Sequence, residues 1–142
     1  METLPYVLVV DDEEVVGQVL TRWLAGWGYH AVAVRRADHS LAVMEALPAP
    51  IVITDIMMPV HDGIWLLEQI HARWPDTVMI VESGARDQQK VLAARKLGAV
   101  DFLAKPFGRE MLFQALQRAA ARIAQPAAGS TQARPSPQLP AA

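Results

Sequence analysis

Five short apolar runs alternate with five stretches of helical periodicity between about residues 5 and 124, and this alternation restricts the fold more than any other feature. The runs LPYVLVV, APIVIT, TVMIVE and AVDFLA are typical of strands buried in a parallel sheet. Strands that alternate with helices of this length form βαβ units with right-handed crossovers. We therefore expect an α/β domain with a doubly wound parallel sheet.

The boundaries of the expected elements follow from turn residues and from changes in hydrophobic periodicity. Gly28 ends the first helix, and Asp38 is expected to be the N-cap of the second. Strands are expected at residues 5–10, 30–34, 51–54, 77–82 and 100–104. Helices are expected at residues 14–26, 38–47, from just after Gly63 to about 73, at 87–97, and from just after Gly108 to about 124.

The composition narrows the class of protein. The 142 residues suffice for one domain, and the net charge of -2 does not indicate binding to nucleic acid or to an anionic membrane. The absence of cysteine excludes disulfides, thiol catalysis and cysteine-ligated metals. The first residues carry no basic leader, and no apolar run approaches the ~20 residues that span a bilayer. We expect a soluble, cytoplasmic protein.

The last segment differs in composition from the rest of the chain. Residues 126–142 contain four of the ten prolines together with alanine, serine and glutamine, and few apolar residues that could anchor a core. Such a segment is typical of a flexible tail or a truncated linker and leaves no room for an output domain. We therefore divide the chain into a domain at residues 1–125 and a tail at residues 126–142.

Polar residues follow four of the expected strands directly. Asp11 and Asp12 follow the first, Asp55 the third, Ser83 the fourth and Lys105 the fifth. The carboxyl ends of parallel strands meet at one edge of the sheet, where open α/β sheets bind ligands. Adjacent carboxylates are costly to bury unless a cation neutralises them, and Mg²⁺ prefers such hard oxygen ligands. The set therefore predicts a site for a divalent metal and a phosphoryl group.

Each of these residues also has an ordinary structural interpretation. The two adjacent aspartates begin a helix, where acids complement the dipole. Asp55 could cap the loop that follows it, and Ser83 could be a helix N-cap. Lys105 could be a solvated residue at a strand end, with a cis bond to Pro106 fixing its direction. Taken singly, these interpretations are strong, whereas the five residues together favour the phosphoryl site.

The order and spacing of these motifs resemble the receiver domain of two-component response regulators along residues 4–124. The motifs are VLVVDDE at 7–13, DIMMPVHDG at 55–63, SG at 83–84 and GAVDFLAKPF at 98–107. The resemblance implies a flavodoxin-like receiver fold, with five helices around a five-stranded parallel sheet of order 2-1-3-4-5. It also implies a phosphoprotein that works in a phosphorelay of the bacterial type.

The resemblance further implies a role for each site residue. Asp55 would accept a phosphoryl group from a phosphohistidine on a sensor histidine kinase or phosphotransfer protein. Ser83 would bind phosphoryl oxygens and would also act with Phe102 as the conformational switch. Lys105 would be the second phosphate-binding residue. The implied ligands of Mg²⁺ are Asp11, Asp12, Asp55 and the backbone carbonyl of Met57.

Three positions depart from the family pattern or tune its chemistry. Glu82 stands where the family usually has an apolar residue. If Ser83 faces Asp55, strand alternation places Glu82 on the opposite face, where it would need a basic partner and would affect conformational balance or partner binding. Met57 and Ala85 occupy the positions that tune dephosphorylation, and neither side chain can orient a water molecule. We therefore expect slow to middling self-dephosphorylation.

Three functions remain open at this point. The leading one is a switch that catalyses its own phosphorylation and dephosphorylation without being a conventional enzyme. It would act on a downstream protein or a missing output domain through the surface of the fourth helix, fifth strand and fifth helix, with homodimerisation as an option. The second is a phosphohydrolase, although Met57 stands where that class needs an acid. The third is a receiver-like interaction module that works without phosphorylation.

Overall fold

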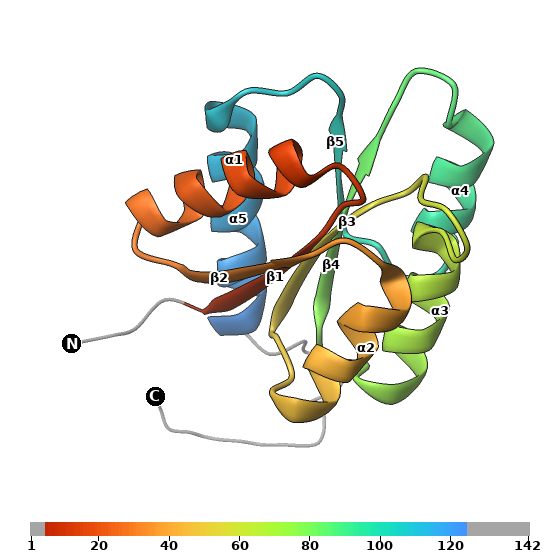
Figure 1. Cartoon of the computed structure of the whole chain (residues 1–142), viewed down its shortest axis with the longest axis horizontal. Helices are drawn as coiled ribbons and strands as arrows, with labels where there is room; N and C mark the ends of the chain where they lie inside the picture. The colour runs from red at the N-terminus through yellow and green to blue at the C-terminus, as the bar shows by residue number, and fades with distance from the viewer. Residues whose placement is uncertain (1–4, 125–142) are drawn as a thin grey trace.

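Ten helices and strands alternate along the chain in the computed structural model, which describes residues 5–124 (Figure 1). The strands are β1 (Tyr6–Val10), β2 (His30–Val34), β3 (Ile51–Asp55), β4 (Val78–Ser83) and β5 (Asp101–Ala104). The helices are α1 (Glu14–Gly26), α2 (Ala37–Ala46), α3 (Gly63–Arg73), α4 (Gln88–Lys96) and α5 (Arg109–Ala124). All strand pairs are parallel, and the sheet order is β2-β1-β3-β4-β5. The predicted doubly wound receiver fold is confirmed.

Helices cover both faces of the sheet, with α1 and α5 on one side and α2, α3 and α4 on the other (Figure 1). Successive residues of β1 divide between the two cores, so that Val7 and Val9 pack on the α1–α5 side and Leu8 and Val10 on the α2–α3–α4 side. All four side chains are completely buried. Burial on both faces explains why this strand lacks the alternation of polar and apolar residues.

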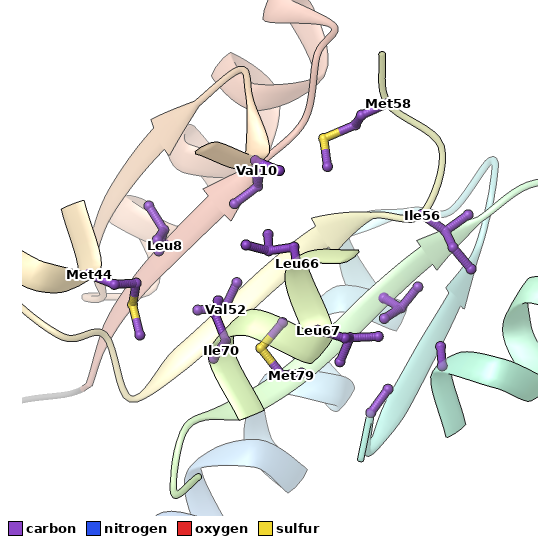
Figure 2. Close-up of a cluster of buried hydrophobic side chains, with 14 of the residues drawn as sticks. Leu8, Val10, Met44, Val52, Ile56, Met58, Leu66, Leu67, Ile70 and Met79 are labelled. Atoms are coloured by element: carbon purple, nitrogen blue, oxygen red, sulfur yellow. The ribbon is translucent and has the colours of Figure 1, made fainter. Parts of the chain in front are cut away.

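Helix α3 supplies much of the apolar contact on the α2–α3–α4 side. Figure 2 shows its Leu66, Leu67 and Ile70 pointing toward the strands. Met44 of α2 and Met79 of β4 belong to the same cluster. Leu66, Leu67 and Ile70 have the spacing of one helix face, and α3 ends at Arg73 as predicted.

The helix ends show one correct and one wrong prediction. Gly28 has a φ of 94°, in the left-handed region, and its N–H donates to the carbonyl of Ala25 as the chain leaves α1. The predicted N-cap at Asp38 is wrong, because α2 begins one residue earlier, at Ala37. Asp38 instead accepts two hydrogen bonds from the guanidinium of Arg36, at 2.9 and 3.0 Å.

Two further expectations concern membrane-spanning helices and the C-terminal tail. Among residues 5–124, none of the helices combines the length and the apolar character needed to cross a membrane. The predicted tail at 126–142 lies outside the described residues.

Candidate functional site

The site forms at the carboxyl edge of the sheet, between β1 and β3. Val10 pairs with Thr54 in the register of these neighbouring strands, so Asp11 and Asp55 follow side by side. The chain after β1 leads to α1 on one face, and the chain after β3 leads to α3 on the other (Figure 1). A parallel sheet leaves a crevice at such a point, where its connections diverge.

Three aspartates gather in this crevice. One carboxylate oxygen from each of Asp11, Asp12 and Asp55 lies within 4.8 Å of the other two. Asp11 and Asp55 are buried, and Asp12 is partly exposed. Hard oxygen ligands at this spacing, open to solvent on one side, fit a cation that keeps several waters, as Mg²⁺ does. The residues present therefore fit the metal that the sequence predicts.

Backbone amides orient two of these carboxylates. Asp11 Oδ1 accepts from the N–H of Glu13 at 2.9 Å, and Asp55 Oδ1 accepts from the N–H of Met57 at 3.2 Å. Each amide holds one carboxylate oxygen and leaves the second for another partner. For Asp55 that partner is Lys105, whereas Asp11 Oδ2 has no hydrogen-bond partner among the described residues.

Lys105 places an ammonium group over the carboxylates. Its Nζ donates to Asp55 Oδ2 at 2.9 Å and lies 3.9 Å from Asp11 Oδ2. Burial alone would lower the pKa of Lys105, but the hydrogen bond to Asp55 and the surrounding negative charges outweigh it and raise the pKa. Lys105 is therefore charged at neutral pH. The bond between Lys105 and Pro106 is cis, as predicted.

Glu82 lies inside the crevice, which corrects the prediction that it faces away from Asp55. The two residues are register partners in neighbouring strands, and such partners point to the same face of a sheet. The basic residue near Glu82 follows β5 and does not come from a helix. The nearby cation is Lys105, with Nζ 3.8 Å from Glu82 Oε1.

Glu82 and Asp11 form a pair of buried carboxyl groups. Glu82 is completely inaccessible to solvent, and Asp11 is 1% exposed. Burial, followed by the contact with Asp11, raises the pKa of Glu82 to about 9. Burial also raises the pKa of Asp11. Two ionised carboxylates can only accept, so neither satisfies the other unless one proton lies between them. Neither Asp11 Oδ2 nor either Glu82 oxygen has a hydrogen-bond partner among the described residues.

The four remaining predicted site residues lie on β4, on β5 and in the loops that follow β3 and β4. Ser83 is buried at the end of β4, but it does not cap α4, whose N-cap position is Asp87. Phe102 is half-buried, with the guanidinium of Arg95 4.9 Å from its ring centroid. The side chains of Met57 and Ala85 are exposed. The roles proposed for these residues in phosphate binding, switching and rate tuning stay predictions.

Two contacts of residues near the aspartate cluster were not predicted from the sequence. Asp62 caps α3 by accepting from the N–H of Trp65 at 3.0 Å, and it also binds Lys90 of α4 at 2.9 Å. Its position before Gly63 and the helix is an N-cap signal that the sequence does contain. Arg35 donates to the backbone carbonyl of Asp12 at 3.2 and 3.3 Å. No local pattern indicates that contact, because the residues are far apart in sequence.

The chain is similar to known proteins along most of its length. The profile of the "Response regulator receiver domain" family matches residues 7–117. C4-dicarboxylate transport transcriptional regulatory protein DctD of Rhizobium meliloti is 36% identical over 119 residues, which cover 84% of this chain and 26% of DctD. Transcriptional regulatory protein FixJ of Bradyrhizobium diazoefficiens is 35% identical over 133 residues, covering 92% of this chain and 63% of FixJ.

A solved structure supports the same assignment. The response regulator receiver domain protein from Clostridium thermocellum superposes with a TM-score of 0.81 at 28% identity. The match covers 85% of this chain and 98% of that protein. The chain spans less than two thirds of the length of DctD and of FixJ. The residues of this chain that match the family profile include Asp11, Asp55 and Lys105. The chain therefore belongs to the response regulator receiver domain family.

Proposed function

We propose that this chain is a phosphorylation switch in which Asp55 accepts a phosphoryl group from a phosphohistidine of a sensor histidine kinase or phosphotransfer protein. The observation that carries the proposal is the contact of Lys105 Nζ with Asp55 Oδ2 at 2.9 Å, inside a cluster of three aspartates. A lysine beside a carboxylate neutralises charge on an incoming phosphoryl group. Membership of the receiver family supports the assignment to two-component signalling.

The proposed step is an in-line displacement at phosphorus. A carboxylate oxygen of Asp55 forms a bond to phosphorus while the bond from phosphorus to the imidazole nitrogen of the donor breaks. The electron pair of that bond leaves with the imidazole, which takes a proton from solvent. Lys105 contacts the phosphoryl oxygens, and Ser83 would donate a further hydrogen bond to them.

Mg²⁺ is the cofactor in this proposal. Asp12, Asp55 and the backbone carbonyl of Met57 would hold it, with Asp11 acting largely through water. The cation would supply positive charge that offsets the negative charge of the transferring group. The exposed side of the aspartate cluster supports this arrangement, because Mg²⁺ keeps several waters when it binds to proteins.

The output would pass through the surface of α4, β5 and α5. Ser83 and Phe102 are the proposed switch, and Arg95, which lies over the Phe102 ring, links that ring to α4. The relatives are longer and their names describe transcriptional regulators. We propose that a downstream protein or an output domain receives the signal, and that this segment does not itself bind nucleic acid.

The experiment that tests this function is intact mass spectrometry after incubation with Mg²⁺ and a small acyl-phosphate donor. We expect wild type to gain one phosphoryl group and Asp55→Asn to gain none, since the amide is not a nucleophile here. Asp76→Asn, which alters an exposed aspartate in the turn after α3, is the matched control and should be phosphorylated normally. An adduct that persists in Asp55→Asn, or no adduct on folded, Mg²⁺-bound wild type, would favour an interaction module that works without phosphorylation.

The lifetime of the phosphorylated state is a second expectation. The exposed Met57 and Ala85 side chains cannot hydrogen-bond an attacking water, so we expect the adduct to last longer than seconds at room temperature. Loss of the adduct can be followed by mass after the donor is removed. Met57→Asn adds a side-chain amide at this position and should shorten the lifetime. Hydrolysis within a few seconds in wild type would contradict the expectation.

A further inference from the structure

Glu82 is a buried carboxylate for which the proposed chemistry has no role. Its side chain is completely inaccessible to solvent, and neither Oε1 nor Oε2 has a hydrogen-bond partner among the described residues. Buried charged groups are costly unless they are paired or coordinate a metal. The position at the end of β4, beside Asp55, aims this carboxylate into the aspartate cluster.

Lys105 does not satisfy Glu82. The ammonium forms its hydrogen bond with Asp55 at 2.9 Å, and its separation of 3.8 Å from Glu82 Oε1 is too long for a second one. Asp11 Oδ2 likewise has no hydrogen-bond partner among the described residues, and it lies 3.9 Å from Lys105 Nζ. The crevice therefore holds four carboxyl groups around one ammonium. The buried end of the crevice therefore has more carboxyl groups than cationic groups.

We propose that Glu82 is a fourth carboxylate of the cation site, and that its charge strengthens the binding of a divalent cation by Asp11, Asp12 and Asp55. The three aspartates supply the oxygens that lie within 4.8 Å of one another. Glu82 contacts Asp11 from the buried side, where charges interact more strongly than at the surface. The inference rests on the cation site of the proposed function and adds a residue to it.

Isothermal titration calorimetry of the whole chain with Mn²⁺, which shares the oxygen ligands of Mg²⁺, tests this role. Glu82→Gln keeps the shape of the side chain but cannot carry a negative charge beside a bound cation, and we expect it to weaken binding on the order of tenfold. Glu82→Val should weaken binding to a similar degree, and it covers the case in which the glutamine variant does not fold. Glu110→Gln, on the exposed side of α5, is the matched control and should bind as wild type does.

A comparison of two cations of different charge tests whether Glu82 acts through its charge or only through its shape. Coulomb energy scales with ionic charge, so the loss of affinity in Glu82→Gln should be larger for Tb³⁺ than for Mn²⁺. Wild-type affinity in Glu82→Gln, or an equal loss for both cations, would overturn the proposal. If wild type itself binds neither cation, the cation site of the proposed function fails. If wild type binds Mn²⁺ and Glu82→Gln binds it equally well, the role of Glu82 alone fails.

Discussion

Glu82→Val is expected to stabilise the cation-free protein, by about 1–4 kcal/mol at mildly alkaline pH, because it removes a buried carboxyl group that lacks a partner. Valine is apolar and smaller than glutamate, and it suits a strand whose neighbouring side chains are apolar. The measurement is urea unfolding followed by circular dichroism in the presence of a chelator. Added Mg²⁺ should reduce the difference in stability between Glu82→Val and wild type, because the Glu82 carboxylate of wild type then has a cation near it.

The pH dependence of the free energy of unfolding also reports on the buried carboxyl group of Glu82. The pKa of Glu82 is about 9 in the folded protein, against an ordinary value of 4.5. The folded state therefore binds this proton more tightly than the unfolded chain does, and the stabilisation is complete below pH 4.5 and lost as the pH rises through 9. The raised pKa of Asp11 acts in the same direction.

We accordingly expect the free energy of unfolding of cation-free wild type to fall between about pH 5 and 9, by up to about 1.4 kcal/mol per pH unit for each proton that the folded state retains. Glu82→Val should show a flatter profile over the same range. A variant that is less stable than wild type at mildly alkaline pH, or that keeps the wild-type slope, would mean that Glu82 is satisfied in the native crevice.

Gly63→Ala is expected to destabilise the protein by about 1–3 kcal/mol or more, because a methyl group has no space at the start of α3. A Cβ on Gly63 would lie 2.5 Å from the carbonyl oxygen of Asp55 and 2.7 Å from the Cα of Ile56. Both are backbone atoms, which cannot move aside as a flexible side chain can. The backbone of Asp55, the proposed phosphoacceptor, would have to shift, so both cation affinity and phosphorylation should fall with stability.

Gly26→Ala is the matched control for this substitution. It lies at the last residue of α1, and a Cβ there meets nothing within 4 Å. Alanine favours a helix over glycine, so this variant should be as stable as wild type or more stable by roughly 0.5–1 kcal/mol. Denaturant unfolding of the two variants beside wild type makes the comparison. Equal stability of Gly63→Ala and wild type would show that the loop after Asp55 adapts without cost.

Helices and strands that bury whole faces are the part of this fold that local sequence predicts well. β2 and α1 have the predicted limits, β3 and β5 differ from the predicted ranges by one residue at one end, and β4 is shifted by one residue at both ends. Apolar periodicity reflects burial along an entire element, so many residues contribute to each prediction. The predicted N-cap of α2 is wrong, because Asp38 lies inside the helix and its carboxylate binds the guanidinium of Arg36. Single polar contacts leave no periodic signal.

The amino-acid sequence by itself determined the α/β alternation and the edge of the sheet at which Asp11, Asp55 and Lys105 meet. Both follow from strand length and chain order, which are local properties. Only the tertiary structure decided where Glu82 points, because the facing of a strand residue depends on the register between β3 and β4. That register pairs Glu82 with Asp55 and excludes water from both. Because of this register, Glu82 lies beside the three aspartates and does not point away from them.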